Sequence, residues 1–184
     1  MSLLKDVLAL FRGNVICIMR KLLYGSRFSY YPFIRLFAKA EIRIRKKGIV
    51  HIGKNAKIDS YAILACNGGK IFIGNRVGIG RNNVVVSQKD ISIGDGTILG
   101  PNVLIYDHDH LFDCKTGVKI DQYSQEAVSI GKNCWIGANT IILKGTVIGD
   151  NCLIAAGSVI KGNYPSGSKI VQKRNTFLLG GNEL

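Results

Sequence analysis

Aliphatic residues recur at every sixth position near the C-terminal end of the chain. Between residues 130 and 160 each of these positions is isoleucine: Ile130, Ile136, Ile142, Ile148, Ile154 and Ile160. Two residues before each isoleucine lies a small or β-branched side chain: Val128, Cys134, Thr140, Thr146, Cys152 and Ser158. The pattern predicts a hexapeptide repeat with two inward-facing positions in each unit.

The same register continues towards the N-terminus in groups of three. The earlier groups are Ile93, Leu99 and Ile105, then Ile73, Ile79 and Val85, then Ile52, Ile58 and Leu64. The register slips only between groups: by three residues near 67–69, by two near 87–89, and by a long excursion over 106–127. If three hexapeptides form one triangular coil, all these insertions leave from the same corner.

Stacked coils of short strands, about 4.8 Å apart and filled by a ladder of Ile and Val, satisfy this pattern. Glycine follows many of the aliphatic residues, where a tight corner needs a positive φ or a close backbone approach. The six-residue period contradicts a helix. We therefore predict an all-β protein, a parallel β-helix of about five triangular coils over 48–162 with an excursion loop at 106–127. Residues 163–184 are expected to form a C-terminal extension.

Residues 1–47 have a different character. Apolar side chains at helical spacing between residues 3 and 23 predict an amphipathic helix. The segment holds eleven Lys and Arg against two acids, which is +9 of the total charge of +13. Arg12 and Asn14 interrupt its apolar run, so it is too short to span a membrane, and it lacks a signal-peptide cleavage site. We favour a segment that caps the open end of the β-helix or packs between subunits. Peripheral contact with the inner membrane is the alternative, and we expect no binding of nucleic acid.

The five cysteines form no CxxC pair and no zinc-like cluster with histidines. This predicts a reduced, cytoplasmic setting. Cys134 and Cys152 are one coil apart, and we favour an inward ladder of thiols over a disulfide between them. Cys114 lies in the excursion, as a reactive thiol or as a tolerated loop residue.

Two stretches carry a family resemblance: "DHDH" at 107–110 and "CWIGANTIILKGTVIGDNCLIAAGSVIKG" at 134–162. Together with the repeats they resemble the left-handed β-helix acyltransferases, the hexapeptide-repeat family, and most of all the sugar O-acetyltransferases of bacterial surface-polysaccharide pathways. The resemblance covers about residues 48–162. It implies a left-handed coil and a homotrimer with each acyl-CoA site in the cleft between adjacent prisms. It also implies acetyl-CoA as co-substrate, a small-molecule or lipid-linked sugar acceptor, and no metal.

Transfer of an acyl group to a hydroxyl needs a base, and a neutral imidazole suits that task. His108 follows a strand end and matches the catalytic histidine of the family. His110 is the competing base or a substrate-binding residue, and both histidines could instead be plain polar loop residues. Asp107 or Asp109 could orient the ring, as carboxylates do in catalytic triads.

The resemblance also assigns residues that hold the acyl donor. The backbone N–H of Ala138, after Trp-Ile-Gly, would donate to the oxyanion. Trp135 would border the pantetheine channel or pack on the loop, and Ala156 and Gly157 match CoA-contact positions. The CoA phosphates would meet three cations, Lys161, Lys173 and Arg174. The chain lacks the Gly-x-Pro-Ala-Lys segment that usually closes the family's fold, which leaves these phosphate contacts open.

Two further expectations concern asparagine and histidine. Asn83, or its neighbour Asn82, is expected to position the substrate, although asparagine is common in turns for backbone reasons. The third histidine, His51, lies about two coils from the loop, which speaks against a zinc site of three imidazoles within one chain.

We predict direct transfer of an acetyl group from acetyl-CoA to a sugar hydroxyl, without a covalent enzyme intermediate. The alternatives are an N-acyltransferase of an amino sugar, which would depend less on His108, and a non-catalytic β-helical scaffold.

Overall fold

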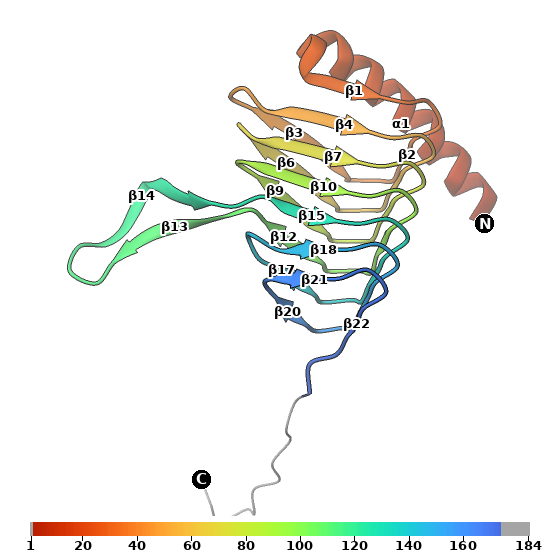
Figure 1. Ribbon diagram of the computed structural model, residues 1–184. Coiled ribbons are helices and arrows are strands. Elements are labelled where there is room, and N and C mark those ends of the chain that lie inside the picture. Colours follow the sequence, from red (N-terminus) through yellow and green to blue (C-terminus); the bar gives the residue numbers. More distant parts are fainter. Residues whose placement is uncertain (1, 174–184) are drawn as a thin grey trace, which may run out of the picture.

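The computed structural model describes residues 2–173 and shows a stack of parallel coils below one helix (Figure 1). Three sheets form the three faces of a prism, and the chain visits them in a fixed order, once per coil. Every strand pair between successive coils is parallel and in register. The architecture is the left-handed parallel β-helix that the repeat and the resemblance predicted.

The strands of each sheet follow one another at regular intervals along the chain. The first sheet contains β1 (Phe28–Tyr30), β4 (Ile49–Ile52), β7 (Lys70–Ile73), β10 (Asp90–Ile93), β15 (Val128–Ile130), β18 (Val147–Ile148) and β21 (Asn163–Tyr164). The second contains β2 (Arg35–Leu36), β5 (Lys57–Ile58), β8 (Gly78–Ile79), β11 (Ile98–Leu99), β16 (Trp135–Ile136), β19 (Leu153–Ile154) and β22 (Lys169–Ile170). The third contains β3 (Glu41–Arg45), β6 (Ile63–Asn67), β9 (Val84–Ser87), β12 (Leu104–Tyr106), β17 (Ile141–Ile142) and β20 (Val159–Ile160).

The stack is longer than the sequence indicated. Strands β1, β2 and β3 form a complete coil before residue 48, and β21 with β22 begins a seventh coil after residue 162. The expected count of about five coils is therefore corrected to six, with a partial seventh. The first coil was hidden because its positive-φ corner residues are Phe33 (φ 68°) and Lys39 (φ 59°), where later coils use mostly asparagine and glycine.

The interior confirms the predicted register. The fifteen aliphatic residues at the sixth positions, from Ile52 to Ile160, are each at most 2% exposed. The preceding inward positions are buried too, from Val128 to Ser158. Cys134 and Cys152 form the expected inward ladder: both are free thiols, and they donate to the carbonyl oxygens of Gly149 (3.1 Å) and Pro165 (3.2 Å).

The insertions share one corner, as predicted. Each leaves after a strand of the third sheet and returns to the first sheet, and we call this the third corner. The corner between the second and third sheets is the second corner. The long excursion forms an antiparallel hairpin of β13 (His108–Asp113) and β14 (Gly117–Gln125), which projects away from the prism (Figure 1).

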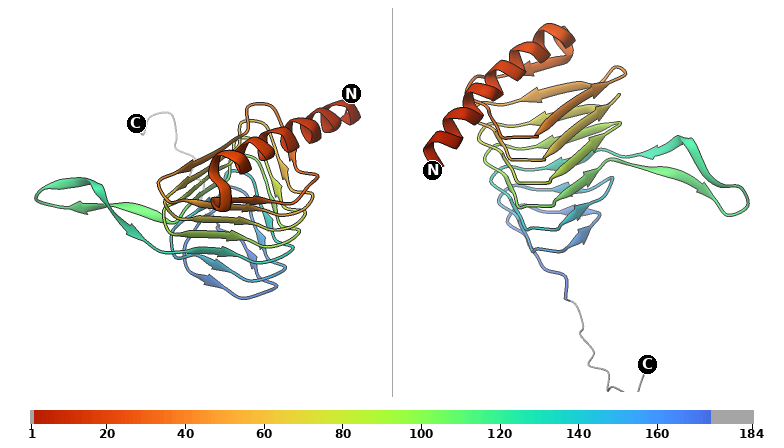
Figure 2. Two further views of the ribbon diagram at one scale, coloured as in Figure 1. Left: turned by 90° about the horizontal axis from the view of Figure 1, so that it is seen from above. Right: turned by 180° about the vertical axis from the view of Figure 1, so that it is seen from behind.

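The helix α1 (Ser2–Tyr24), followed by the 3-10 turn η1 (Gly25–Arg27), runs obliquely across the end of the prism, with its N-terminal part beside the coils (Figure 2). It contacts β1 and β2. Small residues form the face that meets the prism, because a Cβ added at Gly13 would clash with the carbonyl oxygen of Ile34. No helix within residues 2–173 is long and apolar enough to cross a membrane.

Glycine at the corners allows coils to stack closely. A Cβ added at Gly94 would lie 2.6 Å from the carbonyl carbon of Gly131 in the next coil, whereas one at Gly78 would meet only Ile98 side-chain atoms at 3.7 Å. We expect Gly94→Ala to lower the free energy of unfolding by about 1–3 kcal/mol through overpacking. Gly78→Ala is the matched control and should change it by less than about 0.5 kcal/mol. Urea denaturation measures both, and equal effects would contradict the stacking argument.

The cysteines differ in accessibility. Burial raises the pKa of the Cys17 thiol to about 12, and it raises the pKa of Cys66 and Cys134 as well. Cys114, in the turn of the hairpin, is exposed. Because the thiolate is the reactive form, we expect one of the five thiols to react rapidly with Ellman's reagent in the native protein. Cys114→Ser should remove that phase, and a rapid phase that persists in this variant would contradict the assignment.

Candidate active site

The hairpin begins at a buried carboxylate. Asp107 follows β12 at the third corner, and its side chain is 0% exposed. Its oxygens accept hydrogen bonds from Ser87 Oγ (2.7 Å) and from the backbone N–H groups of Gln88 (2.8 Å) and Lys89 (2.8 Å). These donors lie in the preceding coil, where the two-residue slip of the repeat occurs. The slip therefore builds a cradle of donors for Asp107.

Asp107 also holds the candidate base. The Nδ1 atom of His108 lies 2.9 Å from Asp107 Oδ1, and the His108 side chain is 11% exposed. Because a carboxylate oxygen accepts, Nδ1 donates, and the neutral imidazole then carries its lone pair on Nε2. Of the two acids predicted to orient the ring, the structure brings Asp107 to His108. Asp109 is 58% exposed and pairs instead with Lys144, at 3.0 Å.

Aromatic rings surround His108. The ring of Tyr123, on β14, lies edge-on to the His108 ring, with 5.6 Å between the ring centroids. The ring of Tyr106, at the end of β12, is also edge-on to His108, at 6.2 Å. The exposed His110 contacts the same Tyr123 ring at 4.5 Å. Sequence reasoning missed Tyr123, Ser87 and Lys144. The register slip was the one available signal for Ser87, and the other two come together only through the fold.

The residues assigned to the acyl donor gather on another part of the prism. Trp135 begins β16 on the second sheet and is 60% exposed. Ala138 lies at the second corner, and its N–H has no hydrogen-bond partner within residues 2–173. The Ala138 carbonyl accepts from Gly157 N at 2.7 Å, so Ala156 and Gly157 occupy the same corner one coil further on.

The cations predicted to bind the CoA phosphates do not lie together at one place on the prism. Lys161 is exposed at the third corner, two coils beyond His108. Lys173 is exposed at the end of the described chain, and Arg174 lies outside the described residues.

One chain does not bring the base and the proposed oxyanion donor together. His108 lies at the third corner and Ala138 at the second, and the third sheet separates these two corners. The predicted site is therefore split into two halves on each chain.

The asparagine expected to position substrate is turned inwards. Asn83 is 0% exposed, and its Oδ1 accepts from Val103 N at 2.7 Å, while its Nδ2 has no partner among residues 2–173. No surface of this side chain is left for a substrate, which corrects that expectation. Asn82 is exposed, with φ 56°, and its amide donates to Asn102 Oδ1 at 3.2 Å. The Asn102 amide in turn donates to Asn139 Oδ1 at 3.0 Å, so Asn82 belongs to a ladder of turn asparagines at the second corner.

The third histidine lies on the second coil. The His51 ring stacks on Phe72 at 4.7 Å, and its Nδ1 lies 2.9 Å from Ser29 Oγ. Burial lowers the pKa of His51. Within residues 2–173 no group of three or more His, Cys, Asp or Glu side chains is placed to hold a metal ion.

Known proteins share this pattern. The family model "Bacterial transferase hexapeptide (six repeats)" matches residues 127–162. The chain is a hexapeptide-repeat protein. "Probable acetyltransferase Rv3034c" of Mycobacterium tuberculosis is 30% identical to this hexapeptide-repeat protein over 157 residues, which is 76% of this chain and 52% of the relative. "Putative lipopolysaccharide biosynthesis O-acetyl transferase WbbJ" of Escherichia coli is 28% identical over 153 residues, 72% of this chain and 76% of the relative.

A solved structure supports the fold. A mutant of AntD, an N-acyltransferase from Bacillus cereus in complex with dTDP-4-amino-4,6-dideoxyglucose and coenzyme A, superposes with a TM-score of 0.67 at 21% identity. The match covers 85% of this chain and 86% of that chain. The hexapeptide-repeat protein spans about half the length of several curated relatives that it matches.

The cradle around Asp107 can be tested by stability. Asp107→Ala would leave the backbone N–H groups of Gln88 and Lys89 without an acceptor, whereas the Ser87 hydroxyl keeps the carbonyl oxygen of Lys70 at 2.8 Å. We expect the free energy of unfolding to fall by about 2–4 kcal/mol. His108→Ala keeps the cradle intact and should cost less than about 1 kcal/mol. Denaturation curves of both variants check this, and an Asp107→Ala protein as stable as the His108→Ala protein would contradict it.

Proposed function

We propose that this hexapeptide-repeat protein is an acetyl-CoA-dependent O-acetyltransferase that acts on a sugar hydroxyl of a surface polysaccharide or its precursor. The observation that carries the proposal is the contact between His108 and the buried Asp107 at the base of the hairpin. Relatives described as an acetyltransferase and as a lipopolysaccharide O-acetyl transferase support it.

In the proposed reaction His108 Nε2 takes the proton of the acceptor hydroxyl as the oxygen attacks the thioester carbonyl. Asp107 keeps Nδ1–H in place and stabilises the imidazolium that forms. The negative charge on the carbonyl oxygen is met by a preorganised backbone donor, the N–H of Ala138. When the tetrahedral intermediate collapses, the C–S bond breaks and the thiolate of CoA receives the proton from His108.

We infer a homotrimer, because the two halves of the site lie at different corners of one chain. Packing of adjacent prisms would set His108 of one copy against Ala138 of the next. The exposed apolar residues of the hairpin, such as Phe112 (68%) and Ile120 (74%), support this assembly. They are not covered by their own prism and suit contact with a neighbouring copy.

The acyl donor would lie along the second corner. The small residues Ala156 and Gly157 leave the backbone open to an extended pantetheine arm, and Trp135 would border it. Lys161 and Lys173 are exposed cations for the CoA phosphates. Because the described chain contains five unpaired cysteines, we place the reaction in the cytoplasm.

Activity of His108 variants tests the mechanism. His108→Ala should lower kcat/KM by about 10²–10⁴, the usual contribution of a positioned general base. His110→Ala is the control and should retain most of the activity. The measurement is release of the CoA thiol from acetyl-CoA in the presence of a panel of sugar acceptors, and near-native turnover by His108→Ala would remove His108 from the mechanism.

The same panel separates the alternatives. Amino-sugar acceptors that are acetylated in place of hydroxyls, with a weaker dependence on His108, would indicate an N-acyltransferase. Absence of detectable acetyl-CoA binding by calorimetry would favour a non-catalytic scaffold.

A further inference from the structure

The helix α1 turns its large apolar side chains away from the protein. The prism-facing side carries small residues, Ala9, Gly13 and Cys17, which are buried. The outward side carries ten large hydrophobic residues that are 40–82% exposed: Leu3, Leu4, Val7, Leu8, Phe11, Val15, Ile18, Met19, Leu22 and Leu23. A contiguous apolar surface of this kind on a folded protein marks an interaction site.

Cations flank this surface. At 100° per residue, Leu4, Phe11 and Leu22 lie at the centre of the outward face, and no charged residue shares it. Lys5 and Arg12 lie on one flank. Lys21 lies on the other, where its Nζ donates to the carbonyl oxygens of Gly25 and Phe28, both at 3.1 Å. The two acids of residues 1–47 are both paired, Asp6 with Arg35 at 3.8 Å and Glu41 with Arg43 at 2.7 Å. The face is therefore apolar at its centre and positive at its edges.

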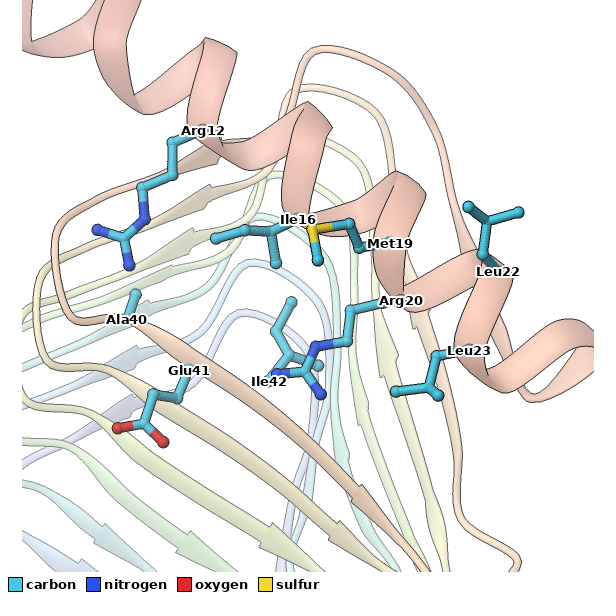
Figure 3. A pocket seen from close by; sticks show the side chains of 9 residues that line it. All are labelled: Arg12, Ile16, Met19, Arg20, Leu22, Leu23, Ala40, Glu41 and Ile42. Atoms are coloured by element: carbon cyan, nitrogen blue, oxygen red, sulfur yellow. The ribbon is translucent and has the colours of Figure 1, made fainter.

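A groove continues the apolar face towards the prism. It has a volume of about 890 Å³ and lies between α1 and β3, the last strand of the third sheet at this end. Met19, Leu22 and Leu23 form its apolar wall, and the guanidinium groups of Arg12 and Arg20 extend from α1 towards β3 (Figure 3). Apolar walls beside cations match the chemistry of a phospholipid, which joins acyl chains to a phosphate.

We propose that α1 docks the protein on an anionic membrane surface, with the helix lying in the plane of the interface. The large side chains enter the boundary between headgroups and acyl chains, Lys5 extends to the lipid phosphates from the flank, and Arg12 meets them in the groove. A second copy of the chain fits less well, because its cationic flanks would repel those of the first. The assignment is narrower than residues 1–47, since residues 28–45 form a coil of the prism.

The proposal fixes the orientation of the prism. Because α1 runs obliquely across the end of the stack, with Lys5 and Leu8 beside Ser60 and Arg81 of the second and third coils, the first coil faces the membrane at a tilt. His108 follows the fourth coil, three strand spacings or about 14 Å further along the axis.

Vesicle sedimentation with the full chain tests the docking. The probes are phosphatidylcholine vesicles with and without phosphatidylglycerol. We expect binding to the anionic vesicles, weakened by salt and by omission of phosphatidylglycerol. The triple change Leu4→Gln, Phe11→Gln and Leu22→Gln should weaken binding about tenfold or more. The conservative triple change Leu4→Met, Phe11→Leu and Leu22→Met is the matched control and should bind as the unmodified chain does.

A second variant guards against misfolding. Lys5→Gln with Arg12→Gln leaves the apolar face intact, and we expect weaker binding to anionic vesicles with an unchanged melting curve. Failure of the unmodified chain to bind anionic vesicles would overturn the proposal. A glutamine triple variant that binds vesicles as tightly as the control would also overturn it. So would a glutamine triple variant whose oligomer mass falls in light scattering while its vesicle binding is unchanged, because the face would then be an interface between copies.

Discussion

The vertical spacing between coils is the constraint on which the rest of the structure depends. Parallel strands stack about 4.8 Å apart, so each residue lies in line with its counterpart in the preceding coil. Interior side chains must then repeat, and isoleucine columns meet that requirement with almost no exposure. Corners must repeat as well, and at Gly94 the next backbone comes so close that a Cβ has no room. A change of side-chain size at a corner therefore affects the neighbouring coils, because the spacing between coils along the axis is fixed.

The proposed site depends on this stacking even where the repeat is broken. Two extra residues at one corner turn the N–H groups of Gln88 and Lys89 towards the next coil. Asp107 in that coil accepts from them, and its remaining acceptor capacity holds the His108 ring. The imidazole lies at a rigid strand end, held by a carboxylate that is itself fixed by the preceding coil. The hairpin contributes Tyr123 beside the ring, but the anchor belongs to the prism.

The period of six predicted coils two to six because the sixth position of every unit is aliphatic without exception. It missed the first coil, where Phe33 and Lys39 hold corner conformations that give no sequence signal. The burial of Asn83 was predictable from the sequence, since it lies two residues before Val85 and that position faces inwards in every unit. The sequence could not predict that Asp107 and not Asp109 contacts His108, because this depends on how the hairpin leaves the corner. The contact with Tyr123 depends on a register shift at residues 110–111 of the hairpin.

The packing of α1 against the prism does not account for all of its apolar residues. A helix that served only to cover the end of a prism would place its largest apolar side chains against the first coil, where burial stabilises most. Here Gly13 brings the helix against the backbone at Ile34, and the fully buried positions of α1 hold small residues, while Ile16 and Tyr24 pack partly against the core. The leucines and Phe11 are consequently directed outwards. Covering the coil explains the small residues, and an external apolar surface is needed to explain the large ones.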